Sequence, residues 1–128
     1  MAKILVIDDS KSVRNQMTEA LSAAGHTVIE GLDGSDGLEK IISHPDLDIV
    51  ITDYNMPGFD GLTMLKNAKN TLGTVNYIVF VLTTETSEKL KLQGKEVGVS
   101  AWIIKPFSAE RLKQAINKIL LLKTSSGA

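Results

Sequence analysis

The sequence has 128 residues, of which 43% are hydrophobic and 23% charged, with a net charge of −1 and no cysteine. This length and composition predict one compact domain. The absence of cysteine excludes disulfides and thiolate metal sites, and the near-zero net charge excludes a strong electrostatic field for nucleic acid or a membrane surface. The sequence contains no run of about 18 apolar residues that would span a membrane. The N-terminal residues lack the layout of a signal peptide, so we expect a cytoplasmic protein.

Short apolar runs rich in β-branched residues predict strands over residues 3–7, 27–30, 48–52, 77–82 and 101–104. Apolar residues at helical spacing predict helices between them. The first helix carries a stripe over 13–24 and stops at Gly25. Further helices are expected over 34–44, over 61–72 with Asp60 as cap, over 86–98, and after Ser108 as N-cap of the last one. Gly94 in the fourth helix either makes that helix easier to displace or leaves room for close packing.

Strands that alternate with helices predict an α/β fold, a doubly wound parallel sheet covered on both faces. Right-handed crossovers leave few arrangements of five parallel strands, and 2-1-3-4-5 is a common one. The domain is expected to cover residues 1–122. The polar tail 123–128 is expected to be disordered.

Polar side chains fall where the predicted strands end. Asp8 and Asp9 follow the first strand and Asp53 ends the third, while Thr83 ends the fourth and Lys105 the fifth. Ligands of open α/β sheets bind beyond the carboxyl ends of the strands, where the strand order reverses. Because that order places the first and third strands side by side, we expect the three aspartates to meet.

Three carboxylates in one crevice repel one another unless a cation joins them. Oxygen ligands without His or Cys favour Mg²⁺, with Mn²⁺ as an alternative, over Zn²⁺. With the ammonium of Lys105 and the hydroxyl of Thr83 at the same rim, the set predicts a phosphoryl-transfer site whose nucleophile is Asp53. Each residue alone could be a solvated loop or turn residue, but their combination favours the functional interpretation.

Four motifs carry a resemblance to a known family. They are Ile-Asp-Asp at 7–9, Asp-Tyr-Asn-Met-Pro-Gly-Phe-Asp-Gly at 53–61, Leu-Thr-Thr-Glu at 82–85 and Lys-Pro-Phe at 105–107. With these spacings the chain resembles the receiver domain of response regulators, of the CheY-like chemotaxis type, over nearly its whole length. The resemblance implies a flavodoxin-like (βα)5 sandwich, and CheY is itself a standard example of the 2-1-3-4-5 order.

The resemblance also implies roles for the site residues. Asp53 would accept a phosphoryl group from the phosphohistidine of a histidine kinase, and Lys105 would pair with that group. The side chains of Asp9 and Asp53 and the carbonyl of Asn55 would hold Mg²⁺, with Asp8 acting mostly through water. The peptide bond between Lys105 and Pro106 would be cis.

A switch and a lifetime control are implied in the same way. Thr83 would move to bond the phosphoryl group, and Trp102 would fill the vacated space, although Trp102 could instead be a partly buried core residue. The family usually has Tyr or Phe at the tryptophan position and a small residue at the position of Thr84. Asn55 and Glu85 lie where the family tunes the lifetime of the phosphate, and Thr84 is expected to slow the access of water.

The expected function is that of a monomeric, single-domain response regulator in a two-component phosphorelay, acting in chemotaxis. It would catalyse only its own phosphorylation and dephosphorylation, and would signal to a protein target or phosphatase through the fourth helix, fifth strand and last helix, without nucleic acid or membrane. Alternatives are a phosphorelay intermediate, a receiver domain excised from a larger protein, a Mg²⁺-dependent aspartyl phosphohydrolase, and a flavin carrier. The adjacent Asp8 and Asp9 do not form the Asp-x-Asp motif of the hydrolase.

Overall fold

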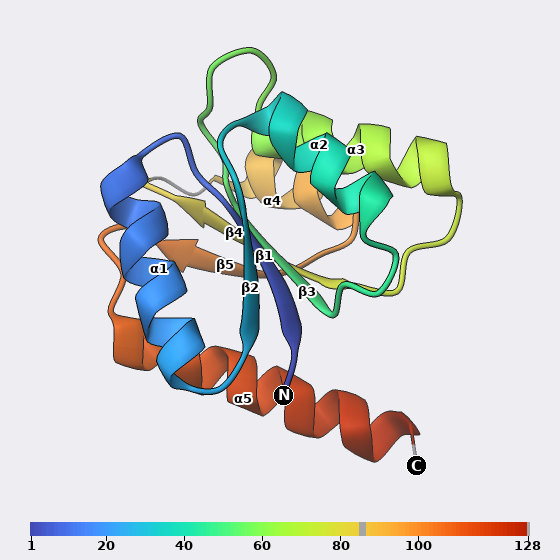
Figure 1. Cartoon of the computed structure of the whole chain (residues 1–128). Helices are drawn as coiled ribbons and strands as arrows, with labels where there is room; N and C mark the ends of the chain where they lie inside the picture. Colours follow the sequence, from blue (N-terminus) through green and yellow to red (C-terminus); the bar gives the residue numbers. More distant parts are fainter. Residues whose placement is uncertain (85–86, 128) are drawn as a thin grey trace.

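The computed structural model describes residues 1–84 and 87–127, and within them five parallel strands form a sheet with helices on both faces (Figure 1). The strands are β1 Lys3–Ile7, β2 Thr27–Gly31, β3 Ile49–Asp53, β4 Ile78–Thr83 and β5 Val99–Ile104. Their order in the sheet is β2-β1-β3-β4-β5, which confirms the predicted doubly wound α/β fold. The order reverses at β1 and β3, which lie side by side.

The helices begin at polar caps. They are α1 Lys11–Ala23, α2 Gly34–Ser43, α3 Gly61–Leu72, α4 Glu88–Glu96 and α5 Ala109–Gly127. The side chains of Ser10, Asp33, Asp60 and Ser87 each accept a hydrogen bond from the backbone N–H three residues further on, as N-caps do. Gly25, with a φ of 93°, follows the end of α1, as predicted.

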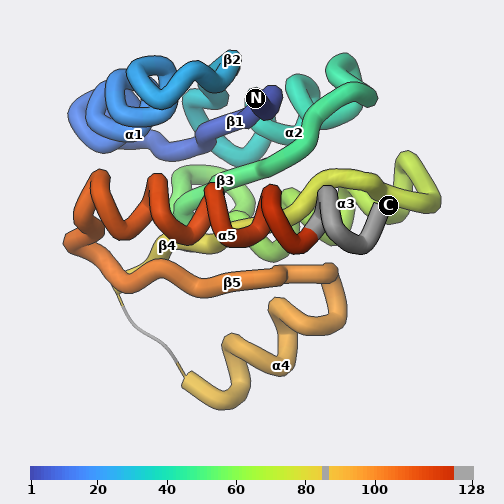
Figure 2. Tube along the Cα trace, turned by 90° about the horizontal axis from the view of Figure 1, so that it is seen from below, coloured from blue at the N-terminus to red at the C-terminus, as the bar shows by residue number. Residues whose placement is uncertain are grey.

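The core lies on both faces of the sheet, since side chains alternate along each strand. On one face α1 and α5 bury Met17, Leu21, Leu112 and Ile116 against the strands. On the other face the strands pack against buried residues of α2, α3 and α4. Figure 2 shows α4 beside β5, at the edge of the sheet remote from β2. With β1, β3 and β4 almost wholly buried, the strand ends that carry polar residues are held rigidly.

Some element bounds differ from the sequence prediction. Helix α4 is shorter than the predicted 86–98, because Ser87 caps its start and Gly98, with a φ of 84°, follows its end. Helix α5 continues to Gly127, past the predicted end of the domain at residue 122. Disorder of the tail 123–128 stays a prediction. No helix among the described residues is long and apolar enough to cross a membrane.

Candidate active site

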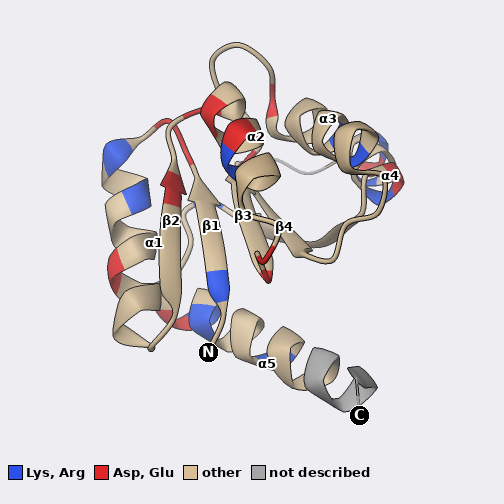
Figure 3. Ribbon diagram, turned by 45° about the vertical axis from the view of Figure 1, so that its right-hand side comes forward, with Lys and Arg blue, Asp and Glu red and all other residues tan. Residues whose placement is uncertain are grey.

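Three carboxylates meet at the carboxyl end of the sheet. Asp8 and Asp9 lie in the loop after β1, and Asp53 is the last residue of β3. Oxygen atoms of all three side chains lie within 4.8 Å of one another. Asp8 is fully buried and Asp53 is 6% exposed, whereas Asp9 is exposed to solvent. Acidic and basic segments both occur at this end of the sheet (Figure 3). The sheet order thus brings together the aspartates that the sequence predicts to meet.

Lys105 supplies positive charge to this cluster. It follows β5, and its backbone N–H donates to the carbonyl of Thr83 at 2.8 Å, which ties the strand ends together. Its Nζ lies 3.1 Å from Oδ2 of Asp8 and 3.2 Å from Oδ2 of Asp53. The Lys105–Pro106 peptide bond is cis. One ammonium group therefore bridges two buried carboxylates.

The positive charge of Lys105 does not fully compensate the burial of Asp53 and the negative charges around it. Burial raises the pKa of Asp53, and repulsion from Asp8 raises it further, while Lys105 acts in the opposite direction without cancelling them. Burial alone would lower the pKa of Lys105, but its hydrogen bond to Asp8 and the charges of Asp8 and Asp53 raise it overall. The ionised cluster is therefore unfavourable by itself, and an additional cation would relieve the repulsion.

The residues present fit a hard divalent cation. The donors are carboxylate oxygens, which suit Mg²⁺, and the exposed Asp9 leaves one side open to water and ligand. Asn55 lies exposed in the loop after β3, and the role of its carbonyl as a ligand stays a prediction. We assign to Asp8, Asp9 and Asp53 the capacity to hold such an ion.

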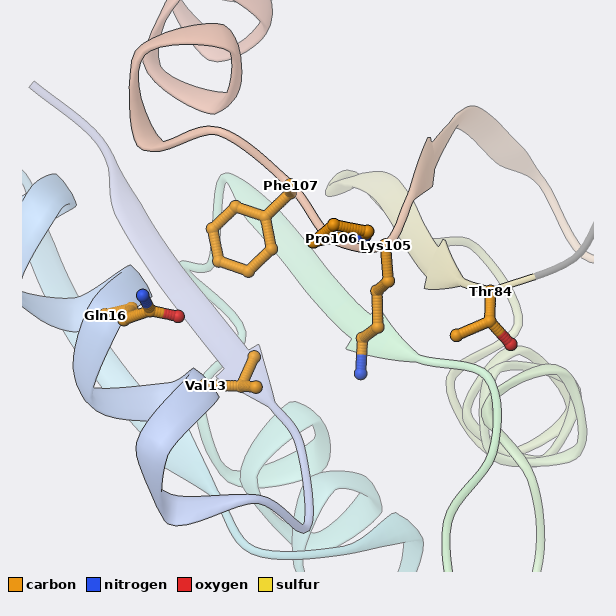
Figure 4. Close-up of a pocket in the computed structure, with 6 residues that line it drawn as sticks. All are labelled: Val13, Gln16, Thr84, Lys105, Pro106 and Phe107. Atoms are coloured by element: carbon orange, nitrogen blue, oxygen red, sulfur yellow. The ribbon is translucent and has the colours of Figure 1, made fainter.

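The two threonines at the carboxyl end of β4, Thr83 and Thr84, differ in exposure. Thr83 is buried at the strand end, while Thr84 is exposed. Thr84 borders a cavity of about 330 Å³, which is lined by Val13, Gln16, Thr84, Lys105, Pro106 and Phe107. Figure 4 shows the Lys105 side chain extending between the α1 residues and Thr84. The methyl and hydroxyl of Thr84 therefore stand beside the approach to Lys105. Glu85 lies outside the described residues.

Trp102 on β5 is half-buried and packs against the core cluster under α2, α3 and α4. Its indole lies over the buried Gly94 of α4, where a Cβ atom would overlap Cζ2 of the ring. Gly94 therefore provides room for the large side chain of Trp102, as one of the two explanations from the sequence proposed.

Replacing Gly94 by alanine should displace Trp102. Alanine favours a helix by about 0.5–1 kcal/mol over glycine, but forcing a side chain into packed space costs about 1–3 kcal/mol. We expect no gain in stability and a red-shifted tryptophan emission, because the ring is pushed toward water. Gln93→Ala, an exposed change in the same helix, serves as control. An emission spectrum of Gly94→Ala identical to that of the unaltered protein, together with higher stability, would contradict the packing argument.

The sequence interpretation did not single out Arg14. This residue of α1 is only 8% exposed, and its Nη1 donates a hydrogen bond to the carbonyl of Asp8 at 2.6 Å. A signal was available, because Arg14 lies at helical spacing between Ser10 and the buried Met17, on the face that α1 turns toward the sheet.

Comparison with known proteins places this arrangement in a family. The family model for the response regulator receiver domain matches residues 4–117. Chemotaxis protein CheY1 of Helicobacter pylori is 31% identical over 119 residues, covering 92% of this chain and 96% of that protein. Protein PilH of Pseudomonas aeruginosa is 32% identical over 120 residues, covering 94% of this chain and 98% of that protein.

A solved structure agrees with these relatives. The crystallised chemotaxis protein CheY4 of Vibrio cholerae superposes with a TM-score of 0.85 at 36% identity, over 92% of this chain and 98% of that one. A receiver domain protein from Methanospirillum hungatei gives a TM-score of 0.89 at 21% identity, which supports the fold alone.

Proposed function

The chain belongs to the response regulator receiver domain family and is a CheY-like signalling domain, a switch rather than a dedicated enzyme; on this premise we propose that Asp53 accepts a phosphoryl group from the phosphohistidine of a histidine kinase. The observation that carries the proposal is the position of Asp53 between Lys105 and the two other aspartates. A carboxylate in that position is nucleophilic and is accompanied by the positive charge that a phosphoryl group needs.

Asp53, Lys105 and Thr83 have different roles in the phosphoryl transfer. An Asp53 carboxylate oxygen attacks phosphorus and forms an O–P bond. The N–P bond of the donor breaks, and the imidazole leaves with the electron pair and takes up a proton. The Nζ of Lys105, already 3.2 Å from the attacking carboxylate, stabilises the charge on the phosphoryl oxygens. Thr83, at the neighbouring strand end, donates its hydroxyl to the new phosphoryl group and couples it to Trp102 on β5.

Mg²⁺ would be held by Asp9 and Asp53 and by the carbonyl of Asn55, with Asp8 acting through water. When bound, it supplies charge neutralisation of the transferring phosphoryl group. Within the chain, Asp8 has a second task, because its side chain accepts hydrogen bonds from the N–H of Ser10 and from Lys105. It thus keeps the lysine aligned while remaining buried.

The protein signals through the surface formed by α4, β5 and α5, which contacts the target. Half-buried Trp102 and exposed Ile104 lie on β5, and exposed Leu92 lies on α4. We assign the chain to chemotaxis signalling in the cytoplasm, as a monomer that contacts a protein target or phosphatase. The names of its chemotaxis relatives from Helicobacter pylori and Vibrio cholerae support this pathway. A phosphorelay intermediate would differ by passing its phosphate on to a histidine.

Fluorescence of the single tryptophan gives a direct test of the site and its coupling. Beryllofluoride, a phosphoryl mimic, is added with Mg²⁺ to the protein and to Asp53→Asn. We expect a saturable change in Trp102 emission in the unaltered protein, none without Mg²⁺, and none in the variant. An equal response in Asp53→Asn would remove Asp53 from the proposed role.

Thr84→Ala should shorten the lifetime of the phosphorylated protein. Because Thr84 borders the approach to Lys105, its removal opens a path for attacking water. We expect loss of phosphate about 3-fold faster or more, equivalent to a barrier lower by about 0.7 kcal/mol. The decay is followed by phosphate release after removal of the donor. Thr74→Ala, an exposed change in the loop between α3 and β4, is the control. Decay of Thr84→Ala at the unaltered rate would disprove the shielding role.

A further inference from the structure

Arg14 makes two polar contacts from a buried position. Its Nη1 donates to the backbone carbonyl of Asp8 at 2.6 Å, and its Nε lies 3.2 Å from Oε1 of Glu30 on β2. The Arg14 side chain is 10% exposed and that of Glu30 is 38% exposed. A buried guanidinium requires partners for its N–H groups, and these two contacts fix its plane. Arg14 therefore connects the first turn of α1, the loop after β1 and the end of β2.

The carbonyl that Arg14 holds belongs to the peptide group between Asp8 and Asp9. On the near side of that peptide, the N–H of Asp8 donates to the carbonyl of Gly31 at 3.3 Å. On the far side, the N–H of Ser10 donates to Oδ1 of Asp8 at 2.8 Å. Three hydrogen bonds, the one from Arg14 and these two, thus fix the backbone from which the Asp9 side chain extends. Because Asp9 is exposed, little packing holds its side chain, and the direction of its Cα–Cβ bond, which this peptide sets, limits where the carboxylate can reach.

We propose that Arg14 is a positioning residue that orients the Asp8–Asp9 peptide so that the Asp9 carboxylate faces Asp53 and completes the cation site. This inference rests on the proposed function, because it requires that the three aspartates hold Mg²⁺. Arg14 contributes no ligand and touches no reacting atom. Its effect comes through the carbonyl of Asp8, in the way that residues around a metal site orient the ligands.

The direction in which Mg²⁺ affinity changes when Arg14 is replaced distinguishes positioning of Asp9 from a simple effect of the Arg14 charge. Arg14 carries a positive charge next to the carboxylate cluster, so its charge alone opposes the binding of a divalent cation. Neutralising it would tighten Mg²⁺ binding if charge were all that mattered. Loss of positioning weakens binding instead, since the Asp9 carboxylate is then free to leave the site. The two explanations predict changes in opposite directions.

Calorimetric titration of Mg²⁺ into the 128-residue protein tests the proposal. We expect the Kd of Arg14→Gln to rise about 10-fold or more, the range seen when residues that orient metal ligands are replaced. Arg14→Lys keeps the charge but loses the planar pair of donors, and its Kd should rise as well. Leu21→Ala opens a cavity under the same helix without touching the loop, and its Kd should stay that of the unaltered protein.

Each outcome of the titration decides the matter. An unchanged or lower Kd in Arg14→Gln overturns the inference, and so does an equal rise in Leu21→Ala, which would show general loosening of α1. Should Arg14→Gln fail to fold, Arg14→Lys decides in the same way, since a Kd equal to that of the unaltered protein rules positioning out. If the unaltered protein bound no Mg²⁺, the proposed function itself would fail and the inference with it.

Discussion

Replacing Lys105 by methionine should lower the free energy of unfolding by about 3 kcal/mol in metal-free buffer, near the lower end of the range for breaking a buried ion pair. Methionine keeps most of the apolar stem but removes the ammonium that lies 3.1 Å from Asp8 and 3.2 Å from Asp53. Two buried carboxylates then face each other without a counter-charge. Urea unfolding, with the slope m compared between the two proteins, measures the loss.

A matched control separates this effect from the general cost of losing a lysine. Lys3 pairs with Asp46 at 2.8 Å, but the Asp46 side chain is 65% exposed. Lys3→Met should therefore cost much less stability than Lys105→Met, because an exposed ion pair contributes little. Mg²⁺ should also reduce the deficit of Lys105→Met, because it supplies positive charge to the same carboxylates. A loss no larger in Lys105→Met than in Lys3→Met would contradict the assigned electrostatics of the cluster.

Asp53→Asn should have the opposite effect and stabilise the protein in metal-free buffer. Burial and the neighbouring charge of Asp8 raise the pKa of Asp53, so the ionised form is less favourable in the folded state than in the unfolded chain. Asparagine is uncharged and similar in shape to the protonated acid. We expect a gain of about 0.5–2 kcal/mol at neutral pH, the usual range for a single stabilising substitution.

The direction in which the stability gain of Asp53→Asn changes with pH follows from the raised pKa of Asp53. A carboxyl with a raised folded pKa binds its proton more tightly in the folded state, so folding of the unaltered protein becomes more favourable as the pH falls through that folded pKa. The advantage of Asp53→Asn is therefore complete above the folded pKa and shrinks as the pH falls from there toward the unfolded pKa of about 3.8. The difference in unfolding free energy between the two proteins, measured at each pH, isolates Asp53. An advantage that grows on acidification would contradict the raised pKa.

The strand ends and their polar residues could be predicted from the sequence because two local signals reinforce each other. Runs of β-branched residues identify strands, and the residue after each run lies at the same edge of a parallel sheet. Asp8, Asp53 and Lys105 follow from this rule alone, with no knowledge of side-chain contacts. Right-handed crossovers then select a strand order that joins β1 to β3, so residues far apart in sequence meet.

Other features could not be predicted because they depend on which side chain reaches which partner across the fold. The packing of Trp102 over Gly94 joins a strand residue to a helix residue whose alignment is set by the loop between them. Helical spacing places Arg14 on the buried face of α1, but its partner, the carbonyl of Asp8, is a backbone atom that residue types do not reveal. The start of α4 also differed, since Ser87 competes with earlier residues as the cap.

The most direct measurement of the central claim is the intact mass of the protein after incubation with a small phosphodonor and Mg²⁺, followed by mapping of the modified residue. The expected result is the addition of one phosphoryl group, located at Asp53, labile at alkaline pH as an acyl phosphate is, and absent in Asp53→Asn and when Mg²⁺ is chelated. Labelling that persists in Asp53→Asn, or no labelling of the unaltered protein with the phosphodonor and Mg²⁺, would contradict the claim.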